Sequence, residues 1–180
     1  MARPFAHRPV LLSESLEYLD PRPDAVIVDG TVGGGGHAAA ILERTEPNGL
    51  LIALDRDPAA LEAAAARLAA FGERVRLVRA SFRALRQVLD AEGIDRVDGV
   101  LLDLGVSSPQ LDVPERGFAF RSEAAERTPL DMRMDPAAEL TAEALLADWS
   151  AEELERCFRS YGELPRSRKL ARRIVAAREQ

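Results

Sequence analysis

A glycine-rich run and three carboxylates are the residues whose types and spacing could do chemistry in this sequence. Four glycines at 33–36 lie between Asp29 and His37, and Asp55 and Asp103 each end a later apolar run. Glycines let a ligand approach backbone N–H groups and permit the positive φ angles of a tight turn. Carboxylates accept hydrogen bonds from sugar hydroxyls and attract cations. The pattern therefore predicts a pocket for a ligand that contains a nucleoside.

The acid before the turn separates the two ligand classes that such a turn commonly binds. Gly33, Gly35 and Ala38 have the spacing of a dinucleotide fingerprint. NAD, however, would bring a pyrophosphate close to Asp29, which would repel it. S-adenosylmethionine carries a cationic amino acid end as well as a ribose, so three carboxylates favour it. Each acid alone could equally be a solvated residue at a strand end. No Gly-Lys-Ser or Gly-Lys-Thr follows the glycines, which excludes a P-loop.

Four apolar runs, separated by helical patterns, must position these residues. The expected strands are 26–29, 50–54, 75–78 and 97–102. A helix is expected at 13–19, and others follow the glycines, begin at Pro58 behind a capping Asp57, and run from 84 to 91. Strands joined by helices of this length form a parallel sheet with right-handed crossovers. The expected fold class is therefore α/β, with a doubly wound sheet.

The alternation of strands and helices stops after Asp103. Residues 105–136 contain prolines and glycines without a period, which is typical of a functional loop or lid. Ser150 and Glu153 then form a capping box at the start of a helix. Four residues of that helix share one apolar stripe: Leu154, Cys157, Phe158 and Tyr161. We therefore interpret Cys157 as a packing residue, and we predict a final basic helix from 166 to about 178.

Charge is distributed unevenly along the chain. The net charge is −6, yet residues 156–180 hold eight basic and two acidic residues, so this segment carries +6 and the remainder −12. Such asymmetry indicates a basic face that could contact phosphates, although basic helices are also often simply solvated. The sequence shows no signal-peptide pattern and no apolar run long enough for a membrane span. With a single cysteine as well, we expect a cytoplasmic protein without membrane contact.

Long motifs of this sequence resemble the bacterial small-subunit ribosomal RNA methyltransferase H family, also called MraW. The matching segments are HRPVLLSE (7–14), DGTVGGGGH (29–37), DRDP (55–58), DGVLLDLGVSSPQLD (98–112), ERGF (115–118), PLDMRMD (129–135) and YGE (161–163). They occur in the same order as in the family, and motifs this long are highly specific.

This resemblance implies a fold, an activity and a substrate. The fold would be the Rossmann-like sheet of class I S-adenosylmethionine-dependent methyltransferases, with its first four strands present, followed by an inserted all-helical subdomain. The expected parts are a cofactor-binding domain at 1–110, a lid or loop region at 111–136, and an incomplete RNA-recognition subdomain at 137–180. The activity would be N4-methylation of a cytidine in the decoding region of 16S rRNA within the 30S subunit. The oligomeric state stays open, with a homodimer as one option.

The resemblance also assigns roles to individual residues. Gly35, Gly36 and His37 would bind the cofactor at the turn, Asp55 would bind the ribose, Phe82 would lie beside the adenine, and Asp103 and Gln110 would line the crevice. A cytosine amine is a poor nucleophile because its lone pair is delocalised, so an acceptor for its proton is needed. Asp103 is the candidate for that catalytic role, with the backbone of 104–107 as the alternative. No metal ligand is assigned.

Two other functions remain open from the sequence. Family members are considerably longer, so we expect this chain to be a truncated form that binds the cofactor weakly and methylates RNA poorly. One alternative is a non-catalytic RNA-binding fragment that keeps the fold, and the other is an NAD-binding oxidoreductase domain.

Overall fold

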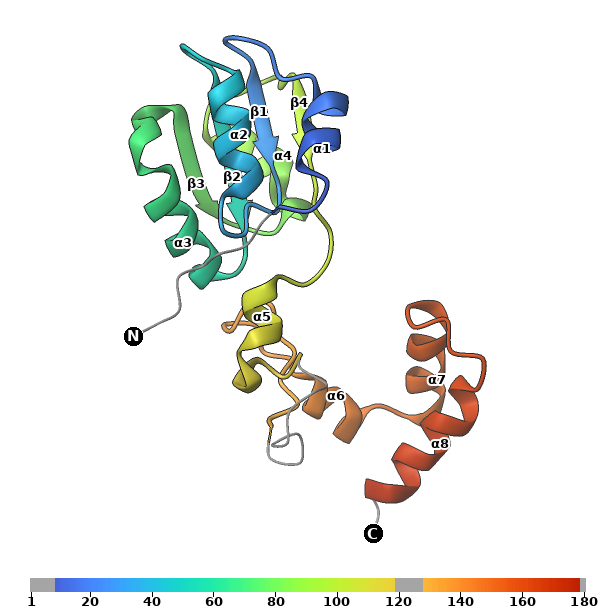
Figure 1. The fold of residues 1–180 in the computed structure, drawn as a ribbon. Helices are drawn as coiled ribbons and strands as arrows, with labels where there is room; N and C mark the ends of the chain where they lie inside the picture. Colours follow the sequence, from blue (N-terminus) through green and yellow to red (C-terminus); the bar gives the residue numbers. More distant parts are fainter. Residues whose placement is uncertain (1–8, 119–127, 179–180) are drawn as a thin grey trace. The chain divides into compact units, whose positions relative to one another are not determined.

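The computed structural model describes residues 9–118 and 128–178 (Figure 1). His7 of the first motif and the centre of the expected lid region lie outside these residues. The chain divides into two compact units, Met1–Pro109 and Gln110–Gln180. The first contains a parallel sheet with helices and the second contains helices and turns. No helix within 9–118 or 128–178 has the length and apolar character needed to cross a membrane.

The sheet of the first unit has four parallel strands in the order β3-β2-β1-β4. Their bounds are Val26–Asp29 for β1, Leu50–Asp55 for β2, Val75–Arg79 for β3 and Gly99–Leu101 for β4. Val26 pairs with Leu50, and Leu51 pairs with Val75. The first three strands confirm the predicted runs. β4 is shorter than the predicted 97–102, because it pairs with β1, and its register ends where β1 ends, at Asp29 opposite Leu101.

Helices cover both faces of this sheet, which confirms the doubly wound α/β class. They are α1 (Leu12–Leu19), α2 (Gly36–Arg44), α3 (Pro58–Leu68) and α4 (Leu85–Ala91). Ile27 and Leu51 pack in one buried cluster with residues of α1, α2 and α3. Their sequence neighbours Val28 and Ile52 pack in a second cluster with Leu89 of α4. The alternation follows from the two-residue period of a strand, and it leaves both faces of β1 and β2 buried.

Local sequence signals explain where these helices begin. The Asp57 side chain accepts a hydrogen bond from Ala59 N, and Pro58 is the first residue of α3, as predicted. α3 ends at Leu68, and a 3-10 stretch continues to Arg74. Another 3-10 turn, Phe82–Ala84, precedes α4 and is capped by Ser81.

The second unit begins with a hydrogen-bonded loop pair. α5 (Ser108–Asp112) crosses the boundary between the units and is followed by a 3-10 turn, Pro114–Arg116. The Arg116 guanidinium donates to the carbonyls of Arg133 and Met134 at 3.0 and 2.9 Å, and Met132 N donates to Arg116 O at 3.0 Å. Arg133 in turn binds the Asp131 carboxylate. The described part of the expected lid is therefore tied together by specific contacts.

Three helices complete the second unit: α6 (Ala142–Asp148), α7 (Ala151–Ser160) and α8 (Ser167–Arg178). The capping box of Ser150 and Glu153 is confirmed, with hydrogen bonds in both directions. Leu154 is buried and Cys157 and Phe158 are half-buried, as the stripe predicted. Tyr161 is 87% exposed, so its place on that stripe is wrong. The helix ends at Ser160, and beyond that point helical spacing no longer determines the direction of a side chain.

Candidate functional site

The candidate site lies at the carboxyl ends of β1 and β4, where the strand order of the sheet reverses. Chain order runs outward from β1 through β2 to β3, and then returns to β4 on the other side of β1. In open α/β sheets, ligands bind in the crevice outside such a switch point. Gly30 N donates to Leu101 O at 2.9 Å, which joins the two strand ends. The glycine turn follows at this edge.

The glycine turn is held by hydrogen bonds from two strand-end carboxylates. Asp29 accepts from Thr31 N at 3.1 Å, and Asp55 accepts from Gly33 N at 3.0 Å. Gly35 has a φ of 76° and is the N-cap of α2, a conformation that favours glycine. A Cβ on Gly36 would lie 2.3 Å from Pro9 Cγ, so the first described segment of the chain packs directly against the turn.

Asp55 connects the end of β2 to both the turn and α3. One of its carboxylate oxygens accepts from Gly33 N, and the other accepts from Asp57 N at 2.9 Å. Each oxygen keeps a further lone pair after these bonds. The residue is half-buried, so the carboxylate has a fixed orientation and remains able to accept a hydrogen bond from a ligand hydroxyl.

Asp103 is the most accessible of the three acids, with a side chain that is 48% exposed. Its backbone N–H donates to Thr31 Oγ1 at 2.7 Å, which fixes the chain directly after β4. Its Oδ2 lies 3.8 Å from Nδ1 of His37, a residue in the first turn of α2. The other ring nitrogen of His37 lies 3.2 Å from the carbonyl oxygen of Val10. The buried His37 ring therefore lies between the N-terminal segment and Asp103.

Asp29 is the buried member of the acid set and is 1% exposed. Burial is the main cause that raises the pKa of its carboxyl to about 7. The hydrogen bond from Thr31 N–H lowers this pKa, whereas the negative charges of Asp55 and Asp103 raise it. Hydrogen bonds show that the three strand ends converge, because Asp29 accepts from Thr31 N, Asp55 accepts from Gly33 N, and Asp103 N donates to Thr31 Oγ1.

The structure brings most of the predicted site residues together in the first unit. Gly35, Gly36, His37, Asp55 and Asp103 surround the turn as described. Phe82 is half-buried in the 3-10 turn after β3, and a Cβ built on Gly30 would lie 3.2 Å from its Cβ. Phe82 therefore lies beside the start of the glycine turn. Gln110 belongs to the second unit, where its side chain is buried.

Sequence reasoning missed three residues that organise this site. Thr31 accepts from Asp103 N, the Val10 carbonyl lies beside the His37 ring, and Arg67 donates to Gly34 O at 3.3 Å. Thr31 and Val10 stand inside motifs that were recognised, but nothing in their spacing indicated these partners. Within the described ranges, no group of His, Cys, Asp or Glu side chains could hold a metal ion.

The donors and acceptors at this edge fit S-adenosylmethionine. Asp55 and the exposed carboxylate of Asp103 can accept from ribose hydroxyls and from a cationic amine. The first N–H groups of α2 have no acceptor within the helix, so they can bind the negative end of an amino acid. A pyrophosphate would meet the carboxylates of Asp55 and Asp103 at the same place, which disfavours a dinucleotide.

Comparisons with solved structures return chains of low similarity, several of which are named methyltransferases. An S-adenosylmethionine-dependent O-methyltransferase from Thermotoga maritima is 23% identical, with a TM-score of 0.43 over 62% of this chain and 38% of that chain. TrmN from Thermus thermophilus is 25% identical, with a TM-score of 0.46 over 56% of this chain and 29% of that chain.

Curated relatives are much more similar in sequence. A Geobacter sulfurreducens protein is 55% identical over 97% of this chain and 55% of its own length. A Thioalkalivibrio sulfidiphilus protein is 54% identical over 97% of this chain and 54% of its own length. Both are named ribosomal RNA small subunit methyltransferase H. This chain therefore spans about half the length of the curated relatives it matches.

A family model described as the MraW methylase family matches residues 4–180. The match confirms the resemblance stated from the motifs, together with the class I methyltransferase fold. The methyl donor of such a methylase is S-adenosylmethionine, which confirms the expected cofactor. The chain belongs to the MraW methylase family.

Proposed function

We propose that this chain forms the cofactor-binding part of an rRNA methyltransferase that transfers a methyl group to N4 of a cytidine in the decoding region of 16S rRNA. The observation that carries the proposal is the convergence of Asp29, Asp55 and Asp103 on one glycine turn at the switch point. The names of the relatives support rRNA of the small subunit as the substrate. The 30S subunit in the cytoplasm is the proposed setting.

Cofactor binding in this proposal uses the glycine turn, Asp55 and Phe82. S-adenosylmethionine, when bound, supplies an electrophilic methyl group. Asp55, already oriented by Gly33 N and Asp57 N, accepts hydrogen bonds from the ribose hydroxyls. The backbone of Gly35, Gly36 and His37 binds the amino acid end, and Phe82 contacts the adenine. The main contribution of these contacts is to hold the reacting groups at near-attack distance.

Asp103 is the proposed acceptor for the proton of the cytosine amine. Its side chain is half exposed while its backbone is fixed by Thr31, so the carboxylate can face a substrate without moving the chain. A hydrogen bond from the amine to Asp103 would localise the lone pair on the nitrogen. The Asp103 carboxylate would receive the proton of the amine after methyl transfer. The target base must be unstacked to reach this carboxylate.

The proposal divides the chain into a cofactor-binding domain at 1–110, a connecting region at 111–136 and an RNA-recognition region at 137–180. A non-catalytic RNA-binding function is the second candidate, because residues 156–180 hold eight basic and two acidic residues, while Asp29, Asp55 and Asp103 lie in the first unit. The two candidates differ in whether the turn binds a methyl donor.

Titration calorimetry of the chain with S-adenosylhomocysteine and with NADH tests the proposal. We expect heat from S-adenosylhomocysteine alone. Binding of NADH would favour the oxidoreductase alternative, and binding of rRNA without either cofactor would favour the RNA-binding fragment. Nucleoside analysis of 16S rRNA after incubation with labelled S-adenosylmethionine tests the position. Label in a nucleoside other than N4-methylcytidine would contradict the assigned target atom.

A further inference from the structure

The second unit presents a cationic surface that the chemistry at the sheet does not use. It consists of Arg166, Arg168, Lys169, Arg172 and Arg173, and we call it the α8 surface. All five side chains are exposed. Together with Ala176 they line a groove of about 490 Å³.

The opposite side of α8 is the packed side. Ser167 and Ala171 are buried there, and Leu154 of the neighbouring α7 is buried as well. Arg178 donates to the carbonyls of Leu146 and Trp149 at 2.7 and 2.8 Å, so this arginine closes the end of α6 and has a structural role. At about 100° per residue, the four cations within α8 fall within an arc of roughly 140° that excludes the packed side, and Arg166 directly precedes the helix.

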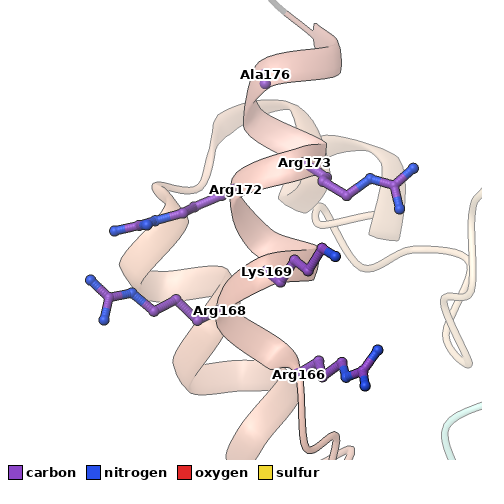
Figure 2. Close-up of a pocket in the computed structure, with 6 residues that line it drawn as sticks. All are labelled: Arg166, Arg168, Lys169, Arg172, Arg173 and Ala176. Carbon is purple, nitrogen blue, oxygen red and sulfur yellow. The ribbon is translucent and has the colours of Figure 1, made fainter.

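Figure 2 shows how these side chains are arranged around the groove. Arg168 and Arg172 extend to one side of the helix, and Arg166 and Arg173 extend to the other. Ala176 lies in the next turn of the helix, beyond Arg172 and Arg173, and has a small side chain. The cations therefore lie on two sides of the helix, and Arg168 and Arg172, four residues apart, are separated by about 6 Å along its axis.

The cations are poorly neutralised by the protein itself. Among the described residues, Arg168 has an acidic partner, Glu155, at 4.0 Å, and Glu155 is also bound to Arg159. No ion pair with another described residue involves Arg166, Lys169, Arg172 or Arg173. α8 contains no acidic residue. Like charges four residues apart, as in Arg168 with Arg172, destabilise a helix by about 0.2–0.5 kcal/mol, so this surface has a folding cost that an anionic partner would remove.

The composition of the surface indicates the chemistry of that partner. Four of the five cations are arginines, whose planar guanidinium groups bind phosphate oxygens through paired hydrogen bonds. The groove is lined by no aromatic residue, so it offers no platform on which bases could stack. A set of charges without a residue for stacking or for base recognition fits a polymer of repeated anionic groups, bound independently of its sequence.

We propose that the α8 surface binds the phosphate backbone of RNA, independently of its sequence, and so anchors the nucleic acid on the second unit. That the RNA is ribosomal rests on the proposed function. Base selection is left to the first unit, because phosphate contacts fix position without specifying sequence.

The test compares two triple variants of the chain with equal loss of charge. One carries Lys169→Gln, Arg172→Gln and Arg173→Gln. The control carries Arg22→Gln, Arg44→Gln and Arg86→Gln, all at exposed positions of the first unit. Fluorescence anisotropy measures the affinity for two labelled oligoribonucleotides of unrelated sequence over a range of salt concentrations, and circular dichroism checks the helical content.

We expect the α8 variant to lose affinity on the order of tenfold at low salt, equally for both sequences. Its slope of log affinity against log salt should fall by about 2, since each contact with a single strand contributes about 0.7. The control should bind as the unmodified chain does. Equal losses in both variants, or a loss confined to one sequence, would overturn the proposal.

Two further measurements separate this inference from the proposed function. Polyglutamate should compete weakly with the labelled RNA and inorganic polyphosphate strongly; equal competition would assign the surface to acidic proteins and contradict a phosphate site. Affinity for S-adenosylhomocysteine should be the same in the α8 variant and the unmodified chain. If the α8 variant loses RNA binding and keeps cofactor binding, both proposals are supported. If the unmodified chain binds the cofactor but no RNA, only the proposal for the α8 surface is contradicted. RNA binding that depends on α8, without cofactor binding, contradicts the methyl-transfer proposal alone.

Discussion

His37 Nδ1 lies 3.8 Å from Asp103 Oδ2, while Nε2 of the same ring lies 3.2 Å from the carbonyl oxygen of Val10. Both neighbours of the ring are hydrogen-bond acceptors, and a neutral imidazole can donate from one nitrogen at a time. The ring is buried, and Asp103 is half exposed. His37 therefore connects the start of the described chain to the carboxylate that we propose as proton acceptor.

Amide replacements of His37 should separate these two contacts. The Asn amide reaches about as far as Nδ1, and the Gln amide reaches about as far as Nε2. His37→Asn should therefore keep a donor for Asp103, whereas His37→Gln should keep a donor for Val10. If the 3.8 Å approach of His37 to Asp103 supports the pocket, His37→Gln weakens S-adenosylhomocysteine binding by up to about fivefold relative to His37→Asn, the factor that corresponds to about 1 kcal/mol. Calorimetry measures both affinities, and a stronger loss in His37→Asn would contradict this prediction.

Asp55→Ala should remove cofactor binding and also destabilise the first unit. The change deletes the acceptors of Gly33 N and Asp57 N, at about 1–3 kcal/mol for each donor left without a partner in a buried place. Asp98→Ala is the matched control, because Asp98 Oδ2 accepts from Val26 N at 2.8 Å at the opposite end of β1. The control should lower the free energy of unfolding without changing the affinity for S-adenosylhomocysteine. Unchanged affinity in Asp55→Ala would contradict the ribose role.

The sequence predicted those parts of this molecule that depend on local chemistry. Asp57 with Pro58, and Ser150 with Glu153, are capping signals whose partners lie two or three residues away, so short patterns suffice to find them. The strands could be predicted because each apolar run is followed by, or ends in, a polar residue. The prediction was wrong for the length of β4, whose end depends on a neighbouring strand.

Contacts between distant residues could not be predicted in this way. The bond from Asp103 N to Thr31 Oγ1 spans 72 residues, and the contact of His37 with Val10 spans 27. The first of these contacts depends on the strand order, which brings β4 beside β1 and not beside β3. The motifs named the cofactor-binding residues by resemblance, but they carried no information on which residues hold these in place.

Asp29 should make the stability of the first unit depend on pH in the direction opposite to that of an ordinary carboxylate. Its pKa is about 7 in the folded chain, mainly because the group is buried, and near its ordinary value when the chain unfolds. Between these two values the folded state binds more protons than the unfolded state, so stability falls as pH rises. The loss of stability caused by ionisation of Asp29 is absent below the pKa that this group has in the unfolded chain. It is complete above about pH 7 and amounts to at most about 4 kcal/mol.

Asp29→Asn tests this directly, because an amide oxygen can still accept from Thr31 N and cannot ionise. The difference in unfolding free energy between the variant and the unmodified chain should grow in favour of the variant from about pH 5 to about pH 8. Asp90→Asn is the control: the hydrogen bond from Arg86 lowers the pKa of this exposed carboxyl, so its contribution has the opposite sign. Denaturant titrations at several pH values provide the measurement. A difference that is flat with pH would show that Asp29 is ionised in the folded chain.

Gly117→Ala should destabilise the second unit far more than Gly93→Ala destabilises the first. Both glycines have positive φ angles, 75° and 69°, so both alanine variants have a backbone strain of about 1–2 kcal/mol. A Cβ on Gly117 would lie 2.7 Å from Pro129 O and 2.8 Å from Asp131 N, which are backbone atoms, whereas a Cβ on Gly93 meets nothing within 4 Å.

Relief of the Gly117 clash requires the segment after Pro129 to move away, and this movement breaks the bond from Met132 N to Arg116 O. The added cost should therefore exceed the strain alone by roughly 1–3 kcal/mol, the range found for overpacking. Fluorescence of Trp149, the single tryptophan of the chain, reports unfolding of the second unit, and far-ultraviolet circular dichroism reports both units. Equal losses of unfolding free energy in the two variants would mean that only backbone strain acts at Gly117. The segment after Pro129 would then move away without a loss of stability.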